Sequence, residues 1–439
     1  MARRRNSGRE VYQTDLLQAM RKCLPTRGLP LISEDGRVRW TPRVLVMTVI
    51  LLVWTQASTL LDAFTGAREV VVGMYDSRRR PGRSLQGFLA ALAKSSAELV
   101  AAVTASLREA LPRVAGRHWR LHGYVVMGVD GSKIECPRTR ANERAFECSG
   151  KPGTTPQMLL TLLFHVGTGL PWAWRRGSGK GSERADLTSM LGDLPRETLL
   201  LADAGFVGYE MLLRLMEAGQ EFIVRAGRNV RLLQRLGFAV EEHAGLVYLW
   251  PEGKRGRPPL VLRLVTVRTG KRTMALLTSV LDGRRLSDAA VADLYRLRWG
   301  VEVLYRTLKQ TLECRKMLST TPAHAAMELD WAVIGLWMLG QMAAEARGRG
   351  RRPSEWSAAR ALRVVRKAMR HRDRPRPAGG LRRQLRRSVK DAYVRHRAKT
   401  ARYWPRKKNE SPPGLPKIRM ATHAERLKAQ GFLSCVALN

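Results

Sequence analysis

The stretch Val291–Lys309 reads VADLYRLRWGVEVLYRTLK and carries two helical patterns at once. Apolar side chains recur at spacings of three and four residues, as on a helix face that is buried against a core. They are Leu294, Leu297, Val301, Leu304 and Leu308. A polar and amphipathic stripe lies next to them, about 100° round the helix. It consists of Tyr295, Arg298, Glu302, Tyr305 and Lys309. Because this stripe adjoins the buried face, we expect it to line the rim of a cleft.

The spacing of the polar stripe leaves two interpretations open. Arg298 and Glu302 are four residues apart, and oppositely charged side chains at that spacing commonly pair along one helix. A carboxylate between cationic side chains at a cleft rim also suits a site for a charged ligand. The helix is predicted to begin after Ser287, a good N-cap residue, and to run to about Met317.

Short apolar runs of strand length lie upstream of this helix and are bounded by Gly or Pro, which predicts a buried sheet. They are Tyr124–Val129, Leu159–His165, Thr198–Ala202 and Glu221–Arg225. Further runs of this kind fall between about 228 and 285, at Leu246–Trp250, Leu260–Val267 and Thr273–Val280. The sequence therefore predicts an α/β core with an inserted β unit.

Two acidic residues directly follow predicted strands. Asp130 lies in Val129-Asp-Gly-Ser132, and Asp203 lies in Ala202-Asp-Ala-Gly205. Each has a structural explanation, because Asp-Gly is a hairpin signal and Asp203 is a suitable cap for a following helix. Acids at strand ends of an α/β sheet also lie where ligands and metals bind. Together with Glu302 they offer an all-oxygen site, which suits Mg²⁺ or Mn²⁺ rather than zinc.

These segments resemble one known family. Tyr295, Arg298, Glu302 and Lys309 match the Y-(2)-R-(3)-E-(6)-K signature of bacterial DDE transposases of the insertion-sequence-four family. The segments Gly128–Ser132 and Leu201–Phe206 also resemble that family's, in the same order, and the resemblance covers about residues 120–345. One departure is Ala204, where many relatives carry arginine, and it puts a local contact in doubt.

The resemblance implies an RNase H-like catalytic core in which Asp130, Asp203 and Glu302 are catalytic and hold two Mg²⁺ or Mn²⁺ ions. Tyr295, Arg298 and Lys309 would bind phosphates near the cut. The expected reaction releases a 3′-OH at each transposon end and then joins it to target DNA, with no covalent protein intermediate. The expected partner is double-stranded DNA, both terminal repeats and target, bound by a homodimer.

The net charge of +41 independently implies a polyanionic partner, and nucleic acid is the expected one. Residues 351–439 hold 26 Lys and Arg against 5 Asp and Glu, which is about half of the whole excess. Arg79 and Arg80, in a basic turn, are candidate DNA contacts, although a solvated loop explains them equally. Trp250 and Trp299 are candidates to stack on an unpaired base, with a core position as the alternative.

The predicted organisation has three parts. Residues 1–115 form an all-α DNA-binding domain, residues 118–350 the RNase H-like domain with its β insertion at about 228–285, and residues 351–439 a basic region that binds DNA or a partner. The apolar run Val44–Trp54 falls short of a membrane span. We therefore expect no membrane association and a cytoplasmic, nucleoid-associated protein. Five cysteines without a CxxC pair favour neither disulfides nor zinc.

Two rival functions fit parts of this pattern. An RNase H-like nuclease would use the same three acids but would cut without joining. A non-catalytic protein that binds DNA or RNA would need only the basic charge, and changing Asp130 to Asn would leave its function intact.

Overall fold

The computed structural model describes residues 7–24, 39–74, 81–148, 154–239, 242, 245–269, 272–348, 353–370, 380–390 and 414–436. The chain divides into two compact units. Unit 1 comprises residues 1–119, 131–181 and 302–391, and unit 2 comprises residues 120–130, 182–301 and 392–439. This division differs from the three predicted ranges, whose boundaries stay predictions.

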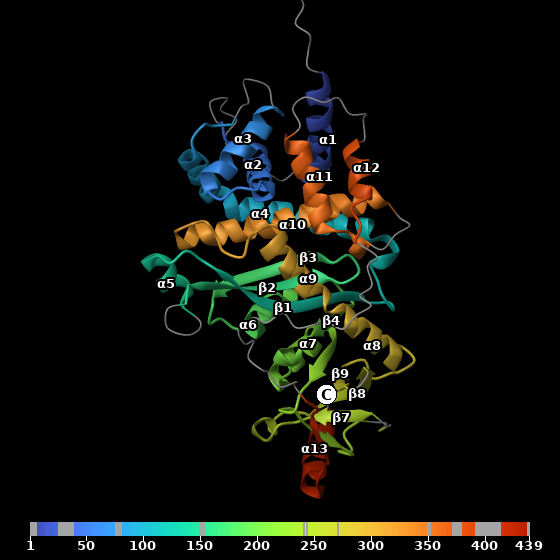
Figure 1. Cartoon of the computed structure of the whole chain (residues 1–439). Helices are drawn as coiled ribbons and strands as arrows, with labels where there is room; N and C mark the ends of the chain where they lie inside the picture. Colours follow the sequence, from blue (N-terminus) through green and yellow to red (C-terminus); the bar gives the residue numbers. More distant parts are fainter. Residues whose placement is uncertain are drawn as a thin grey trace, which may run out of the picture. The chain divides into compact units, whose positions relative to one another are not determined.

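Unit 1 is mainly helical (Figure 1). Its helices, including short 3-10 and π segments, are α1 (Ser7–Cys23), α2 (Pro42–Trp54), α3 (Leu60–Val72), α4 (Leu85–Ala115), η2 (Gly116–His118), α5 (Arg140–Phe146), most of α9 (Gly300–Arg306), η6 (Thr307–Thr311), α10 (Pro322–Arg347), η7 (Pro353–Glu355), α11 (Ala358–Arg370) and α12 (Gly380–Arg386). The prediction of a helical N-terminal region is confirmed.

Helix α10 is the centre of unit 1, because it is buried along most of its length and packs against α1, α2, α4, α11 and α12. Thr321 caps its first turn and Pro322 occupies its first position, where a missing N–H costs nothing. Helix α2 is buried as predicted, and the Trp54 indole N–H donates to the Gly335 carbonyl of α10 at 3.0 Å. The basic stretch after residue 350 thus contributes α11 and α12 to this core.

By length and composition alone, one helical stretch of the described chain, Leu85–His118, is long and apolar enough to cross a membrane. In unit 1 this stretch includes α4, which packs against α10 and buries one face of the helix there. That packing is typical of a core helix.

The strands of unit 1 are β2 (Gln157–His165), β3 (Leu170–Ser178) and the second half of β1 (Val125–Glu135), in the order β1-β2-β3. Strands β2 and β3 are antiparallel. Asp330 of α10 accepts hydrogen bonds from the indole N–H of Trp174 at 2.8 Å and from the Nε of Arg176 at 3.0 Å. These bonds hold α10 against β3.

Unit 2 contains most of the strands. They are the first half of β1, β4 (Thr198–Ala202), β5 (Glu221–Ala226), β6 (Arg231–Gln234), β7 (Leu246–Leu249), β8 (Leu260–Thr269), β9 (Arg272–Thr278) and β10 (Lys417–Met420). Their order is β10-β6-β7-β8-β9-β5-β4-β1. Strands β1, β4 and β5 are parallel and largely buried, as expected of strands covered on both faces.

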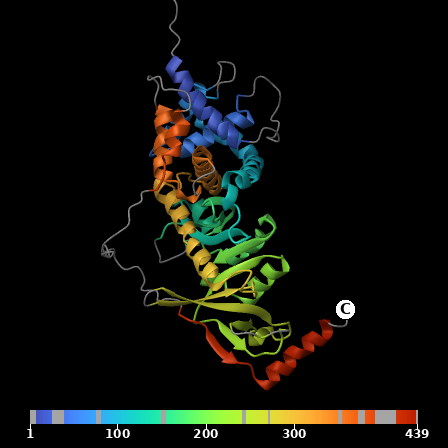
Figure 2. The ribbon, with the colours of Figure 1, turned by 90° about the vertical axis from the view of Figure 1, so that its right-hand side faces the viewer.

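The helical segments of unit 2 are α6 (Glu183–Ser189), η3 (Leu191–Asp193), η4 (Ala204–Phe206), α7 (Tyr209–Glu217), η5 (Glu252–Lys254), α8 (Asp288–Leu297) and α13 (His423–Val436). Strands β6 to β9 form an antiparallel set that joins the core through β9 and β5, and this is the predicted insertion. Strand β10 and α13 extend from its far edge (Figure 2). The predicted α/β fold class with an inserted β unit is confirmed, and its RNase H-like character stays a prediction.

Two tryptophans give a test of the core of unit 1. Trp54 is 0% exposed and Trp299 is 60% exposed. We expect Trp54→Ala to lower the free energy of unfolding by about 3–5 kcal/mol through a cavity and the loss of the indole hydrogen bond to Gly335. Trp299→Ala, the matched control, should stay within about 0.5 kcal/mol of the wild type. Urea unfolding followed by tryptophan fluorescence measures both, and equal losses would contradict the packing described.

Candidate active site

Asp130 and Asp203 lie at the same level on adjacent parallel strands, just past the last paired residues of β1 and β4. The register pairs Gly128 of β1 with Leu201 of β4, so residues 130 and 203, two positions further on, are at the same level. Asp130 is inside β1, just past its buried part, and not in a turn. The hairpin interpretation of the Asp-Gly pair is therefore wrong, because β1 continues through it to Glu135.

Asp203 also caps the turn that follows it. Its Oδ1 accepts the Gly205 backbone N–H at 2.7 Å at the start of η4. Arg184 of α6 fixes the other side of this turn, since its Nε donates to the Gly205 carbonyl at 2.6 Å and its Nη2 to the Val207 carbonyl at 2.9 Å. The capping interpretation is correct, and it uses one carboxylate oxygen in a turn that is held in place.

Arg225 of β5 extends this row of strand ends. Ala202 of β4 pairs with Val224 of β5, so Arg225 is at the level of Asp203. Its Nε is buried and has no hydrogen-bond partner among the described residues. Arg225 was not among the predicted site residues, and its position at the end of the predicted strand Glu221–Arg225 was the one signal for it in the sequence.

Tyr295 of α8 lies among these charges. Burial raises the pKa of its hydroxyl above the ordinary value, Asp203 raises it further, and Arg298 and Arg225 lower it. The Arg298 guanidinium carbon is 5.6 Å from the centre of the Tyr295 ring. Two residues of the predicted polar stripe are thus in the electrostatic environment of Asp203, within unit 2.

The long helix predicted from Ser287 is interrupted. Ser287 caps α8 as predicted, by accepting the Ala290 N–H at 3.2 Å, but α8 ends at Leu297 and α9 begins at Gly300. Glycine is a poor helix former, and its position here explains the break. Leu297, predicted to be buried, is 44% exposed because it lies at this break.

Lys309 belongs to unit 1, in the π-helical turn η6. Its Nζ donates to the Ser132 Oγ at 2.8 Å, two residues beyond Asp130 on β1. Burial lowers the pKa of Lys309 below the ordinary lysine value, Arg315 lowers it further, and Glu135 raises it. Tyr305, in the preceding turn, donates its hydroxyl to the Leu160 carbonyl of β2 at 2.8 Å, which ties this helix to the sheet of unit 1.

Glu302, on α9, is half-buried and belongs to unit 1 with Lys309, whereas Asp130 and Asp203 belong to unit 2. Among the described residues, no group of three or more His, Cys, Asp or Glu side chains forms a ready metal site. A joint role for the three carboxylates is therefore a proposal, taken up below.

The other predicted DNA contacts have different outcomes. Trp250 is 2% exposed, and its indole N–H donates to the Arg257 carbonyl at 2.7 Å, so the structure gives it a core position instead of a stacking one. Trp299 is exposed at the helix break. Arg79 and Arg80 lie outside the described residues. The four described cysteines whose state is defined are free thiols.

Comparison with known proteins identifies the segment that carries these residues. Residues 121–338 match the family model described as "Transposase DDE domain". The transposase InsG for insertion sequence element IS4 of Escherichia coli (strain K12) is 27% identical over 230 residues, which is 49% of this chain and 51% of that protein. The putative transposase y4zB of Sinorhizobium fredii is 29% identical over 147 residues, 31% of this chain and 40% of that protein.

A third relative, the putative transposase for insertion sequence element IS4SA of Synechocystis, is 20% identical over 199 residues, 42% of this chain and 56% of its own length. The chain thus spans about half the length of the curated relatives that it matches. A cryo-EM structure of the piggyBac transposase synaptic complex with hairpin DNA overlaps 88% of this chain and 77% of its own, at 11% identity and a TM-score of 0.38, which is too low to bear on the fold. By sequence, residues 121–338 match the transposase DDE domain family, and the IS4 transposase is among the relatives of this chain.

Proposed function

We propose that the chain is a DNA transposase that cuts transposon ends and joins the 3′-OH to target DNA. The observation that carries the proposal is the row formed by Asp130, Asp203 and Arg225, which lie at one level across three parallel strands. Such a row offers carboxylates for metal binding beside a cation for phosphate binding. The family match supports this function over a purely binding role.

Asp130, Asp203 and Glu302 are the proposed metal ligands. Carboxylate oxygens suit hard cations such as Mg²⁺ or Mn²⁺. Two such ions, when bound, stabilise the attacking and leaving oxygens of an in-line displacement at phosphorus. The capped, clamped turn after Asp203 supports this assignment, because a ligand held before the metal arrives loses less freedom on binding.

Cationic side chains around the acids hold the DNA backbone in this proposal. The guanidinium groups of Arg298 and Arg225 can each bind two oxygens of one phosphate, whereas Lys309 supplies a point charge. Tyr295 stacks with the Arg298 guanidinium, whose carbon lies 5.6 Å from the centre of its ring. The exposed Trp299 is the remaining candidate to stack on an unpaired base.

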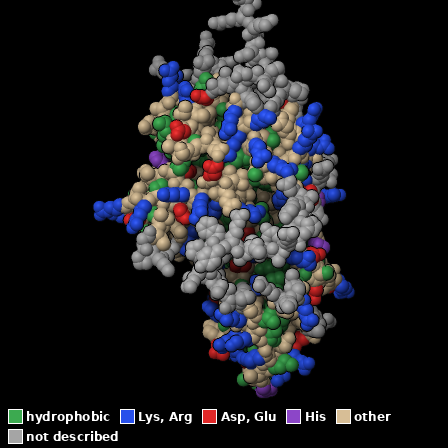
Figure 3. Space-filling model, in the orientation of Figure 1, with side chains coloured by type: hydrophobic (Ala, Val, Ile, Leu, Met, Phe, Trp, Pro, Cys, Tyr) green, Lys and Arg blue, Asp and Glu red, His purple; other side chains and the backbone are tan. Residues whose placement is uncertain are grey.

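The proposed partner is double-stranded DNA, both terminal repeats and target, bound by a homodimer in the cytoplasm at the nucleoid. Lys and Arg side chains are spread widely over the face drawn in Figure 3, with only scattered acidic ones. The net charge of +41 gives such a surface a strong, salt-sensitive affinity for DNA.

The function is tested with purified protein, Mg²⁺, a duplex that carries the terminal repeats of the element and a supercoiled plasmid. We expect nicks that leave free 3′-OH ends, followed by covalent joining of the labelled duplex to the plasmid, visible on a denaturing gel. Cleavage without joining favours the rival nuclease, and binding without cleavage favours the non-catalytic alternative.

Substitution of the acids tests their assignment. We expect Asp130→Asn, Asp203→Asn and Glu302→Gln each to slow cleavage at least about a hundredfold. Removal of a group that only orients a metal ligand already lowers activity about 10–100-fold, and removal of the ligand itself should lower it at least as much. DNA affinity measured in EDTA should not fall. Glu217→Gln, an exposed acid of α7, is the matched control and should cleave at the wild-type rate. Unimpaired cleavage by any of the three variants would remove that residue from the site.

The pH dependence of cleavage tests Lys309. Its pKa is lowered, so its charge is lost at a lower pH than that of a free lysine, and a phosphate contact weakens as pH rises through this value. We expect single-turnover cleavage to decline at high pH and Lys309→Arg to move the decline upward, because guanidinium stays charged. Lys309→Gln should be slow at every pH. A decline at the same pH in the wild type and Lys309→Arg would show that another group titrates.

A further inference from the structure

Strand β10 brings two cations together in unit 2. It pairs in parallel with β6, and the register places Lys417 opposite Arg231. Both side chains are exposed. Like charges at paired positions of neighbouring strands repel and destabilise the pair. A strand that carried no ligand there would be more stable with a neutral or acidic residue at one of the two positions.

The fold neutralises the next cation along β10 but not this pair. Arg419 forms an ion pair with Glu425 of α13, with Nη1 2.8 Å from Oε2, and Arg255 pairs with the same carboxylate. Within the part of the chain that the structure describes, Lys417 and Arg231 form no ion pair. Their charges are therefore available to an anion from outside.

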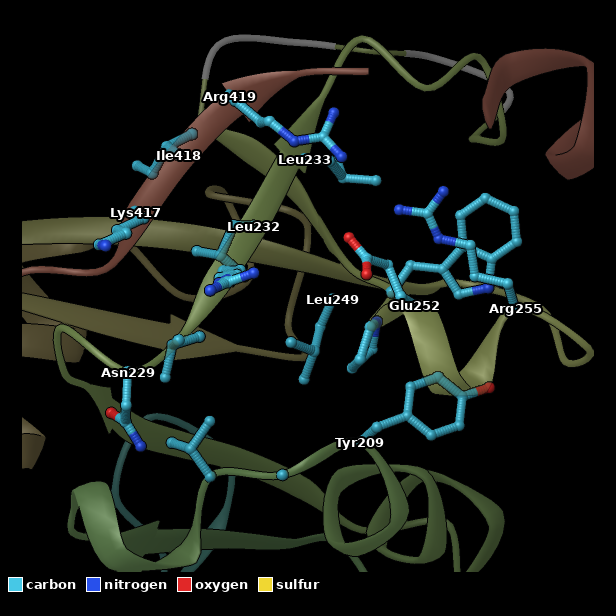
Figure 4. Close-up of a pocket in the computed structure, with 16 residues that line it drawn as sticks. Tyr209, Asn229, Leu232, Leu233, Leu249, Glu252, Arg255, Lys417, Ile418 and Arg419 are labelled. Atoms are coloured by element: carbon cyan, nitrogen blue, oxygen red, sulfur yellow. The ribbon is translucent and has the colours of Figure 1, made fainter. Parts of the chain in front are cut away.

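The pair lies at a cavity of about 490 Å³ that is lined by β6, β7 and β10 (Figure 4). The acidic residue of the lining, Glu252, faces the Arg255 and Arg419 side of the cavity, across from Lys417. On the cavity lining, Lys417 and Arg419 of β10 and Arg231 of β6 are all cationic. The β10 side of the cavity thus has a net positive charge.

We propose that Arg231 and Lys417 form a phosphate-binding site that holds the phosphodiester backbone of DNA, separate from the row of Asp130, Asp203 and Arg225. A phosphate between the two side chains replaces their mutual repulsion with two charge-assisted hydrogen bonds. The choice of DNA as the source of the phosphate rests on the proposed function. On this basis β10 is a strand that extends the DNA-binding surface of the inserted β unit.

The test uses the full chain in EDTA, so that no cleavage occurs, and a 30-base-pair duplex, with affinity measured by fluorescence anisotropy from low to moderate salt. Each phosphate contact contributes about one to the slope of log K against log salt. We expect Arg231→Gln and Lys417→Gln each to lower that slope by about one. In the absence of DNA, neither variant should melt below the wild type, because each removes a repulsion.

Arg268→Gln is the matched control, because Arg268 is also an exposed strand arginine of unit 2 but faces the neutral Thr273. Its slope should stay closer to the wild type than those of the two test variants. An unchanged slope in Arg231→Gln and Lys417→Gln, or an equal drop in the control, overturns the proposal. So does a lower melting temperature with an unchanged slope, which a purely structural pair would give.

Inorganic phosphate separates the two sources of the ligand. If millimolar phosphate raises the melting temperature of the wild type but not of Lys417→Gln, while the DNA slopes are equal, the site takes free phosphate and the DNA assignment is wrong. Because DNA binding is measured in EDTA, the salt slopes can be interpreted even if the wild-type protein does not cleave DNA. The failure of the proposed function and the failure of this site are thus distinguishable.

Discussion

The parallel register of β1, β4 and β5 is the constraint on which the rest of the site depends. Backbone hydrogen bonds fix Gly128 opposite Leu201 and Ala202 opposite Val224, and this alone puts Asp130, Asp203 and Arg225 at one level. A slip of one residue would move every side chain of β4 to the opposite face of the sheet. Since β4 is buried at every position, both of its faces would then have to pack again. The packing of the hydrophobic core therefore determines where Asp130, Asp203 and Arg225 lie, although these residues are not part of it.

Contacts within each unit fix the chain next to these residues. In unit 2, Arg184 donates to two carbonyls of the turn after Asp203, and in unit 1, Lys309 donates to Ser132, which follows Asp130 by two residues in the sequence. The chain passes between its two units at the peptide after Asp130 and at the peptide before Glu302. Two of the three proposed metal ligands thus lie at covalent junctions between units, whereas Asp203 lies within one.

Much of this arrangement follows from local sequence patterns. Buried strands read as short apolar runs, and Ser287 and Thr321 act as the caps that their side chains predict. Asp130 and Asp203 are predicted at strand ends because each directly follows an apolar run of strand length, and a charged side chain is not expected inside such a buried strand. The family signature added Lys309 and also Glu302, whose spacing alone could not be separated from an ordinary ion pair with Arg298.

The rest depends on tertiary contacts that no local pattern encodes. Arg225 becomes significant only through the register with β4, and the burial of Trp250 only through its bond to the Arg257 carbonyl. Strand β10, four exposed residues in a basic stretch, has no apolar run to mark it and exists because β6 offers an edge. The helix break at Gly300 was masked by an unbroken apolar stripe, in which Leu297 then proved exposed.

The central claim is that Asp130, Asp203 and Glu302 bind divalent cations together. Anomalous X-ray diffraction from crystals of the protein with its terminal-repeat DNA and Mn²⁺ measures this directly. The account predicts manganese peaks at about 2.0–2.3 Å from carboxylate oxygens of all three residues. Ordered density for the three side chains, with no peak between the two aspartates or with Glu302 bound elsewhere, would contradict it.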